Sequence, residues 1–288
     1  MDYAVVISTL NRKRSLGKTI DSIFKQTIKP KEFMIMLDRN SNIENMAFLL
    51  KYKKKYPLIR IYHSKENLGA CTLINLGVKK ATSEYILNID DDAILPNEDW
   101  VELSYKNFRD NVGLIWGNVF GTLNFAKFGE FFIGCVFVTR KDIFQEVGMF
   151  DEKLFIYSND TDLAIRLNRY GYRVLPLKKR MVIHPYGPPG PKFYEFASSN
   201  RLLLYWKYYP YWVSFIMTIF HVIQEIREMR DYSLLKFWLK GMKRFISKLY
   251  WIGLSYKDRM TIVEFLKSSY QLHFPSLGYY LVRFLYGL

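Results

Sequence analysis

Short apolar runs and amphipathic segments alternate between residues 3 and 89. The apolar runs have the length and the β-branched and aromatic content of buried strands. Between them, apolar residues recur at helical spacing, first in a segment that we expect Ser15 to cap and Pro30 to end. The predicted strands are 3–8, 33–37, 59–63 and 85–89, and the helices after the first are 46–56 and 73–81.

Beyond residue 95 the pattern is less regular. We predict strands at 113–120, 131–139, 173–176 and 181–184, with helices at 141–147 and 160–170. The segment 184–191, rich in proline and glycine, must form a loop, which could close over a ligand or serve as a linker. The later segments have helical spacing. We therefore predict an α/β domain at 1–195, with a mixed, mainly parallel sheet flanked by helices, and a helical region at 196–288.

The net charge of +15 indicates a polyanionic partner. Residues 197–288 hold 13 Lys and Arg against 5 Asp and Glu, together with 22 of the 50 aromatic residues. Basic and aromatic residues together are typical of a membrane interface, where Trp and Tyr lie among the headgroups and Lys and Arg meet anionic lipid. The region contains no recognised nucleic-acid-binding motif, and we expect no nucleic acid as a partner.

Two segments of this basic region bear on membrane contact. Residues 234–249 place five Lys and Arg residues among Phe, Trp and Leu, as in an amphipathic helix that lies in the headgroup region. A helix packed on the α/β domain with solvated lysines is the alternative. The apolar stretch 208–223 contains Pro210 and His221 and is shorter than the roughly 20 residues of a spanning helix. We expect an interfacial or shallow re-entrant helix there, and peripheral membrane contact through 205–288.

The cysteines and the N-terminus bear on the compartment. Cys71 and Cys135 have the spacing of neither a disulfide framework nor a metal site, so a reducing compartment fits. The apolar run after Asp2 is too short for the hydrophobic region of a signal peptide. We expect a cytoplasmic protein at the inner face of the membrane.

Asp90, Asp91 and Asp92 directly follow the strand 85–89. Ligands of open α/β sheets bind outside the carboxyl ends of the strands. Three carboxylates there repel one another, and a divalent cation with oxygen ligands would stabilise them. Such a cation could bridge the phosphates of a nucleotide. Acids that cap a turn and face solvent are the alternative.

Two common phosphate-binding motifs are missing from the sequence. The first strand leads into Ser8–Arg12 rather than into G-x-G-x-x-G, and no G-x-x-x-x-G-K-S/T loop occurs. A dinucleotide-dependent dehydrogenase and a P-loop ATPase therefore lose their support. An enzyme that holds a nucleotide through carboxylates and metal remains.

Eight segments, in order, carry a resemblance to one family. They are S-T-L-N-R at 8–12, T-I-D-S-I-F-K-Q-T at 19–27, M-L-D-R-N-S at 36–41, N-L-G at 67–69, N-L-G at 75–77, L-N-I-D-D-D at 87–92, G-M-F-D-E at 148–152 and N-D-T-D-L at 159–163. The chain thereby resembles the inverting glycosyltransferases of family 2, with the GT-A fold, over residues 3–205. The processive signature Q-x-x-R-W is not found, so the resemblance is to non-processive members such as rhamnosyltransferases and galactofuranosyltransferases.

The resemblance implies a set of donor-binding residues. Asp38, at the end of the second strand, would accept a hydrogen bond from the nucleobase, although a turn-forming aspartate is the alternative. Ser8, Thr9 and Arg12 would lie near the nucleoside and the phosphates. The set is completed by Asn67, Gly69, Asp90 and Asp91.

It also implies the metal ligands and the catalytic base. Asp92 would be the principal ligand of Mn²⁺ or Mg²⁺. Asp90 would contribute to binding either the metal or the ribose. His184 would be a further ligand, since imidazole suits Mn²⁺ better than Mg²⁺. Asp160 would be the base that takes the proton of the acceptor hydroxyl, unless it only caps the helix. Asp162 is the reserve candidate.

We therefore predict a metal-dependent inverting glycosyltransferase. It would move one sugar from a nucleotide-sugar donor, by default a UDP-sugar, to a glycan or a lipid-linked acceptor. Asn159 departs from the family pattern, which often has Glu there, and this leaves one charge fewer to raise the pKa of the base. The alternatives are a nucleotidyltransferase, which would normally carry a glycine-rich, lysine-bearing loop after the first strand, and a non-catalytic membrane-bound nucleotide-sugar-binding protein.

Overall fold

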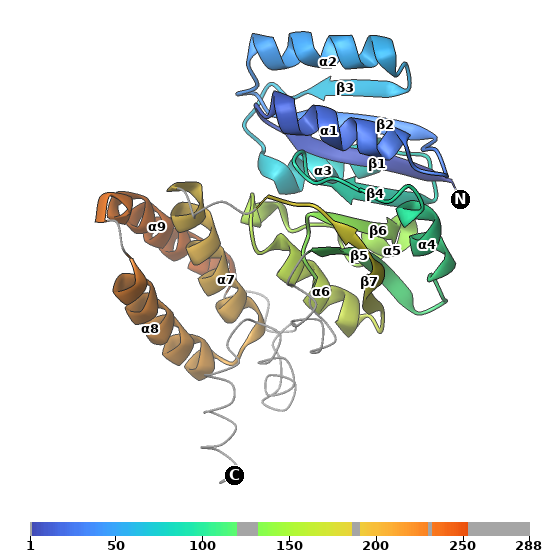
Figure 1. Ribbon diagram of the computed structural model, residues 1–288. Coiled ribbons are helices and arrows are strands. Elements are labelled where there is room, and N and C mark those ends of the chain that lie inside the picture. The colour runs from blue at the N-terminus through green and yellow to red at the C-terminus, as the bar shows by residue number, and fades with distance from the viewer. Residues whose placement is uncertain (1, 120–131, 186–190, 230–231, 253–288) are drawn as a thin grey trace. The chain divides into compact units, whose positions relative to one another are not determined.

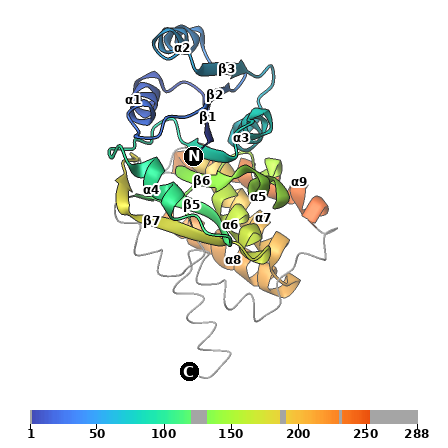
Figure 2. The same ribbon diagram turned by 90° about the vertical axis from the view of Figure 1, so that its right-hand side faces the viewer.

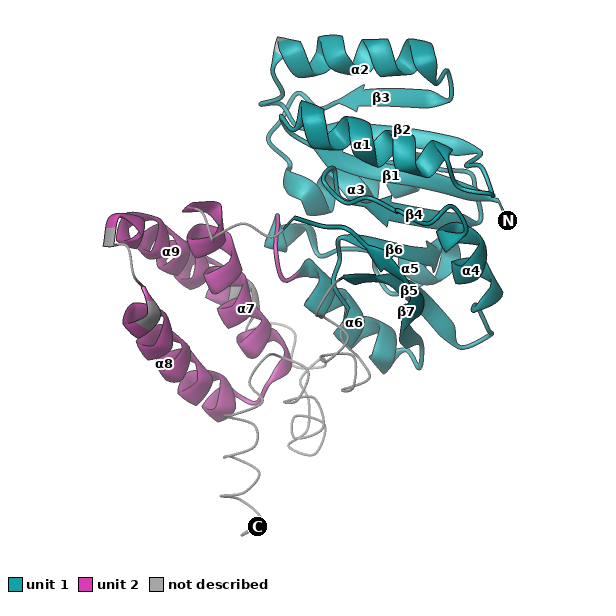
Figure 3. Ribbon diagram, viewed as in Figure 1, with its two compact units in different colours: residues 1–155, 159–186 teal, residues 156–158, 187–288 magenta. Residues whose placement is uncertain are grey.

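The computed structural model describes residues 2–119, 132–185, 191–229 and 232–252 (Figure 1). The chain divides into two compact units (Figure 3). Unit 1 consists of residues 1–155 and 159–186, and unit 2 of residues 156–158 and 187–288.

A seven-stranded sheet forms the centre of unit 1, with the strand order β3-β2-β1-β4-β6-β5-β7. Neighbouring strands pair in parallel, except that β6 runs antiparallel to both β4 and β5. The predicted mixed, mainly parallel sheet is therefore confirmed. The strands are Tyr3–Thr9 (β1), Glu32–Leu37 (β2), Ile59–His63 (β3), Tyr85–Ile89 (β4), Val112–Val119 (β5), Val136–Arg140 (β6) and Arg173–Val182 (β7).

Helices cover both faces of this sheet. They are Lys13–Phe24 (α1), Ile43–Lys55 (α2), Gly69–Lys80 (α3), Trp100–Lys106 (α4), Lys141–Glu146 (α5) and Asn159–Arg169 (α6). Figure 2 shows α1 and α4 on one face and α3, α5 and α6 on the other. Because side chains alternate between the faces of a strand, Val5 belongs to the same buried core as Leu16 of α1, whereas Val6 faces α3. A Cβ at Gly77 would lie 2.5 Å from Val6 Cγ1, so this glycine allows α3 to pack closely on β1.

The predicted strands 59–63 and 85–89 have the predicted bounds. The helices α2 and α3 begin about one turn earlier than predicted, because Asn42 caps α2 through a 2.8 Å hydrogen bond from Asn45 N and Gly69 opens α3. Ser15 is not a cap. It lies in the first turn of α1 and donates a hydrogen bond to the carbonyl oxygen of Arg12.

Two further predictions of elements were wrong, and one helix was missed. The strand predicted at 131–139 begins only at Val136, because residues 132–135 form an irregular segment and a turn; residue 131 lies outside the described residues. The strands predicted at 173–176 and 181–184 are one strand, β7, whose register against β5 shifts where Leu177 gives way to Met181. The short helix α4 was not predicted at all.

Unit 2 is helical where it is described. Its helices are Ser198–Tyr208 (α7), Tyr211–Glu228 (α8) and Leu235–Ile252 (α9), and a turn of π-helix, Phe193–Ala197, precedes α7. Gly241 allows α9 to approach that turn, since a Cβ there would lie 2.6 Å from the carbonyl oxygen of Glu195. None of the helices in the described residues is long and apolar enough to cross a membrane.

Glu225 is the centre of a polar cluster within unit 2. Its carboxylate accepts hydrogen bonds from Ser198 Oγ and, at 2.7 Å, from Trp238 Nε1. His221 Nε2 lies 3.2 Å from the other carboxylate oxygen. The hydrogen bonds and the ion pair with His221 hold the pKa of Glu225 below its usual value, although burial acts in the opposite direction. The cluster thus joins α7, α8 and α9.

In unit 1, Asn75 links two of the sequence motifs. Its Nδ2 donates to the carbonyl oxygen of Phe150 at 2.9 Å and to Glu152 Oε1 at 3.1 Å, and its Oδ1 accepts from Phe150 N at 3.1 Å. Asn75 is buried. The helix α3 is thereby tied to the segment that leads towards α6.

We expect Asn75→Ala to lower the free energy of unfolding by about 2–3 kcal/mol, because it leaves the backbone groups of Phe150 buried without their partner. Urea-induced unfolding followed by circular dichroism measures the change. Asn107→Ala is the matched control, since Asn107 is exposed and bonds only within its own helix to Leu103 O. It should change stability by no more than about 0.5 kcal/mol. Equal effects of the two substitutions would contradict the role of Asn75.

Candidate active site

The direction of the strands gathers polar residues at one edge of the sheet. Because β1, β2, β4 and β7 share one direction, their carboxyl ends meet there, and the antiparallel β6 begins at the same edge. Asp38 follows β2, Asp90 follows β4, and His184 comes two residues after β7. Residues that are distant in sequence therefore meet at this edge.

Backbone hydrogen bonds bring His184 to the aspartates. Ile94 and Ile183 form an isolated antiparallel bridge, with N–O distances of 2.8 Å and 3.0 Å. On the other side, Asp90 N donates to the carbonyl oxygen of Cys135 at 2.8 Å. The segment after β4 is thus held between the end of β7 and the start of β6.

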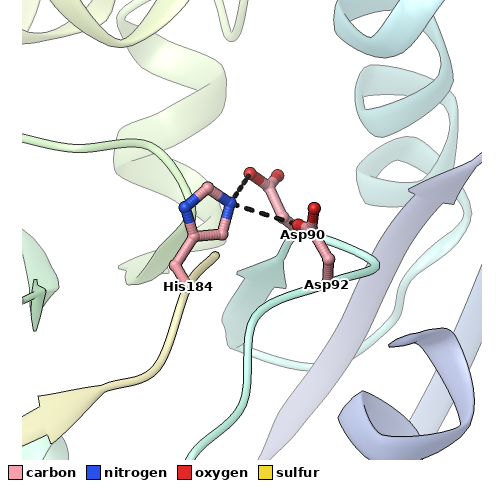
Figure 4. A group of neighbouring side chains, drawn as sticks. All are labelled: Asp90, Asp92 and His184. Carbon is pink, nitrogen blue, oxygen red and sulfur yellow. Dashed lines mark ion pairs between the residues drawn. The ribbon is translucent and has the colours of Figure 1, made fainter. Parts of the chain in front are cut away.

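Asp90, Asp92 and His184 form the tightest cluster of potential metal ligands in the described residues (Figure 4). His184 Nε2 lies 3.1 Å from Asp92 Oδ1 and 3.6 Å from Asp90 Oδ2. One ligand atom from each residue lies within 4.8 Å of the others. Ligands of a single ion cannot be farther apart than twice the metal–ligand distance, which is about 4–5 Å for divalent cations. The cluster therefore fits one ion held by two carboxylates and an imidazole.

His184 supplies positive charge to this cluster without a metal. Burial favours the neutral imidazole, but the hydrogen bonds and ion pairs with Asp90 and Asp92 outweigh it and raise the pKa of His184 to about 9. The imidazole is therefore protonated at neutral pH. A metal ion would have to displace this proton from Nε2, which couples metal binding to pH.

Arg12 and Thr9 are held by Asp91. Thr9 Oγ1 donates to Asp91 Oδ2 at 2.5 Å, and Arg12 Nη1 lies 3.4 Å from Asp91 Oδ1. Arg12 also forms an ion pair with Asp92. Burial raises the pKa of Asp91 to about 6, although Thr9 and Arg12 act in the opposite direction. Three of the predicted donor-binding residues thus form one hydrogen-bonded group beside the metal-ligand cluster.

Asp38 organises a second group. Its Oδ2 accepts a 3.0 Å hydrogen bond from Gly69 N, and Asn67, with its side-chain amide oriented so that the nitrogen faces Asp38, donates to Oδ1 at 3.0 Å. Gly69 has a positive φ of 75°, and a Cβ there would lie 2.4 Å from the ring of Phe155. Only glycine meets both demands without strain. Asp38, Asn67 and Gly69, which the sequence grouped as donor-binding residues, therefore lie together.

Asp160 lies at the start of α6. Its Oδ1 accepts a 2.8 Å hydrogen bond from Thr161 N, and its Oδ2 accepts a 3.3 Å bond from Gly134 N. Burial raises the pKa of Asp160 above its usual value, against the effect of these backbone N–H groups. A Cβ at Gly134 would lie 3.2 Å from Asp160 Cβ, so a side chain there would crowd the carboxylate.

Asp162 differs from Asp160 in its surroundings. Its side chain is fully buried, and its Oδ2 accepts bonds from Arg166 Nε at 3.0 Å and Arg166 Nη2 at 2.7 Å. These two hydrogen bonds, both to Oδ2, fix Asp162 within α6. The Asp162 carboxylate therefore has a structural role within α6.

The sequence analysis missed Gly134 and Phe155. Gly134 lies in the segment that was predicted to be a strand, and a glycine within an apolar run is the signal that could have indicated a turn. Phe155 gave no signal, because its contact with Gly69 depends on the fold.

Ser8 lies next to Thr9 on β1 and is half-buried. Of the predicted loop 184–191, residues 186–190 lie outside the described residues.

The chain is similar in sequence to known glycosyltransferases. Residues 4–148 match the family described as Glycosyl transferase family 2. The poly(ribitol-phosphate) beta-N-acetylglucosaminyltransferase TarP of Staphylococcus aureus (strain N315) is 31% identical over 116 residues, which cover 40% of this chain. The matched part is 35% of TarP, so the similarity spans about a third of that protein.

Two solved structures share the fold at 16% sequence identity. The mannosyltransferase PcManGT from Pyrobaculum calidifontis, in complex with GDP-Man and Mn²⁺, has a TM-score of 0.61 and covers 87% of this chain and 71% of its own. GalNAc-T7 with UDP, GalNAc and Mn²⁺ also has a TM-score of 0.61, over 88% of this chain and 58% of its own. Since the family match covers half of the residues and the sheet is that of solved GT-A glycosyltransferases, the chain belongs to glycosyl transferase family 2 and has the GT-A fold.

Proposed function

We propose that this chain is a metal-dependent, inverting glycosyltransferase that transfers single sugars from a nucleotide-sugar donor. The observation that carries the proposal is the cluster of Asp90, Asp92 and His184 at the carboxyl edge of the sheet. PcManGT and GalNAc-T7, which share the fold, are described with a nucleotide or nucleotide sugar and Mn²⁺. A UDP-sugar is the default donor, and a glycan or a lipid-linked glycan is the acceptor.

The donor would lie along the edge formed by β1, β2 and β4. Asp38 would accept a hydrogen bond from the nucleobase, with Asn67 and Gly69 fixing its carboxylate. Ser8 and Thr9 would lie near the nucleoside. Arg12 would meet the diphosphate, because it is more than half exposed and is tethered only by Asp91 and Asp92. Asp91 holds Thr9 and Arg12 in place for this purpose.

Asp90, Asp92 and His184 would hold the metal as a DxD-type site with one added imidazole. A bound Mn²⁺ or Mg²⁺ would neutralise the diphosphate as it leaves. In the absence of metal, protonated His184 and Arg12 balance the aspartates, which keeps the site assembled. Mn²⁺ suits this mixed oxygen and nitrogen ligand set better than Mg²⁺.

Asp160 would be the general base. Burial raises the pKa of Asp160 above its usual value, which makes it a stronger base, and the hydrogen bonds from Thr161 N and Gly134 N hold the carboxylate in one orientation. Asp162 cannot readily take this role, because Arg166 binds it and no part of its side chain is exposed. Since Asn159 bears no charge, burial is the main cause that raises the pKa of the base.

The charge of the chain supports a membrane location. We place the enzyme in the cytoplasm, peripheral at the inner face of the membrane, with contact through residues 205–288. Lys236, Lys240 and Lys243 are exposed on α9, as an interfacial helix requires. A lipid-linked acceptor would be reached at such a surface.

The proposal is tested by a donor-hydrolysis screen in which water takes the place of the acceptor. We expect the wild-type chain to release free nucleotide from one class of nucleotide sugar only when Mn²⁺ or Mg²⁺ is present. Asp92→Asn should reduce this release at least a hundredfold, because one metal ligand loses its charge. Asp110→Asn, at an exposed aspartate away from the cluster, is the matched control. Pyrophosphate release from a nucleoside triphosphate instead would identify a nucleotidyltransferase, and binding without turnover would identify a non-catalytic protein.

We expect Mn²⁺ affinity to rise with pH between pH 7 and pH 9, by up to about tenfold per unit, because the metal displaces the proton of His184. The rise should level off above the pKa of about 9. The same proton stabilises the metal-free fold. That contribution is complete below the usual histidine pKa of about 6.5 and is lost as the pH rises through about 9. Titration of Mn²⁺ followed by electron paramagnetic resonance measures the affinity. His184→Gln should abolish most of the slope, whereas His63→Gln, on β3, should retain it; a pH-independent wild type would refute the assignment.

Asp160→Asn should lower the rate of metal-dependent donor hydrolysis by about 10²–10⁴-fold and leave the donor dissociation constant within a factor of two. The reason is that Asn fills the same space and keeps one of the two backbone hydrogen bonds, but it cannot accept the proton. Initial rates and calorimetric titration measure the two quantities. If Asp160→Asn retains more than a tenth of the wild-type rate, the base is another residue.

A further inference from the structure

The helix α8 exposes an apolar face along its length. Tyr211 and Trp212 begin the row, and it continues through the large hydrophobic side chains of Phe215, Ile219, Phe220, Ile223 and Ile226, each 44–59% exposed. At 100° per residue, these positions fall within one half of the helix circumference. The opposite side carries Val213, Met217 and His221, which are buried in unit 2.

Exposed apolar side chains are arranged differently in unit 1. Leu50, Tyr105 and Tyr170 are exposed there on separate elements or loops, and Met181 and Ile183 form only a pair at the end of β7. Scattered exposed hydrophobic residues are normal on soluble proteins, whereas a contiguous apolar face marks an interaction surface. The row on α8 is therefore the feature that requires a partner.

The helix α9 contributes less apolar surface than its sequence indicates. Its largest apolar side chains, Trp238 and Phe245, are buried in unit 2. Its exposed side combines Leu235, Leu239 and Ile246 with the neighbouring lysines. This helix therefore presents a narrow apolar edge beside a basic one.

The charged side chains of unit 2 that the structure describes and that are exposed have one sign. Among its described side chains, every charged residue in the exposed class is basic, and these residues are Lys192, Arg227, Lys236, Lys240 and Lys243. Its described acidic residues, Glu195 and Glu225, are partly buried. Two copies of this surface would repel each other, whereas an anionic lipid surface would attract each of them.

We propose that the apolar face of α8 is the surface that inserts into an anionic bilayer, with α8 lying in the plane of the headgroups. The inference rests on the proposed membrane location and names the helix that makes the contact. Phe215, Ile219 and Ile223 lie towards the acyl chains, and Tyr211 and Trp212 lie at headgroup level. Lys236, Lys240 and Lys243 of α9 meet the anionic headgroups.

A single cysteine on α8 tests this directly, because Cys71 and Cys135 are buried and should not react. Ile219→Cys in the full chain is labelled with an environment-sensitive maleimide dye. We expect labelling in buffer as fast as at Leu50→Cys, an exposed control position in unit 1. Vesicles of phosphatidylcholine with phosphatidylglycerol should shift the emission of the dye at position 219 to the blue and leave the dye at position 50 unchanged. Slow labelling at position 219 would mean that another part of the chain or a second copy covers α8. Rapid labelling without a shift in emission would mean that α8 does not enter the bilayer. Either result overturns the proposal.

Vesicle sedimentation provides the second measurement. Phe215→Glu with Ile219→Glu should weaken binding to the anionic vesicles at least tenfold, and Leu50→Glu should not. Changing Lys236, Lys240 and Lys243 together to Gln should weaken binding to anionic vesicles several-fold and leave binding to phosphatidylcholine alone unchanged. The α8 double variant should keep metal-dependent donor hydrolysis, which verifies its fold. Unchanged vesicle binding by this variant refutes the α8 face, whereas vesicle binding without donor hydrolysis in the wild type refutes only the transferase.

Discussion

Repulsion among aspartates at one sheet edge is the constraint on which the site depends. The three acids follow one another at the carboxyl end of β4, and the side chains of Asp91 and Asp92 are largely buried, so little solvent screens their repulsion. Two cationic side chains offset this repulsion: Arg12, which lies after β1, and His184, which follows β7. Both cations come from other parts of the chain, so folding and assembly of the site are one event. A metal ion bound there would add positive charge to a site in which three carboxylates face two cations.

The accuracy of the predicted bounds differed from element to element, according to how clearly the pattern of each element shows in the sequence. The strand β4 is a short buried run, and β3, at the edge of the sheet, alternates apolar and polar residues; the limits of both were predicted correctly. The seven-residue α4 is too short for helical periodicity to emerge, and its Trp100 resembles part of any buried segment. The strand β7 was divided in two because Lys178–Arg180 interrupt its apolar pattern. Its pairing with β5, which continues after a shift in register, is a tertiary property that a local pattern does not contain.

The candidate site was predicted from motifs rather than from periodicity. Asp38 was named from one segment and Asn67 and Gly69 from another, and the structure places both beside the Asp38 carboxylate, with a 3.0 Å hydrogen bond from Gly69 N. What the sequence could not separate were two aspartates two residues apart. The Asp160 carboxylate accepts hydrogen bonds from backbone N–H groups, one of them that of Gly134 in the turn before β6. The Asp162 carboxylate forms an ion pair with Arg166. Helical geometry predicts the pair of Asp162 and Arg166, four residues apart, but the contact with Gly134 requires the sheet.

The C-terminal helices show why composition alone does not identify an interaction surface. The sequence of α9 mixes lysines with Trp and Phe, and that composition is typical of an interfacial helix. In unit 2, however, Gly241 allows α9 to approach the turn before α7, and Trp238 donates to Glu225, so the aromatic side of α9 faces inwards. The helix α8 is less basic but turns its polar His221 inwards and its apolar residues outwards. A buried polar cluster thus orients α8, and this orientation decides which of its apolar residues remain exposed.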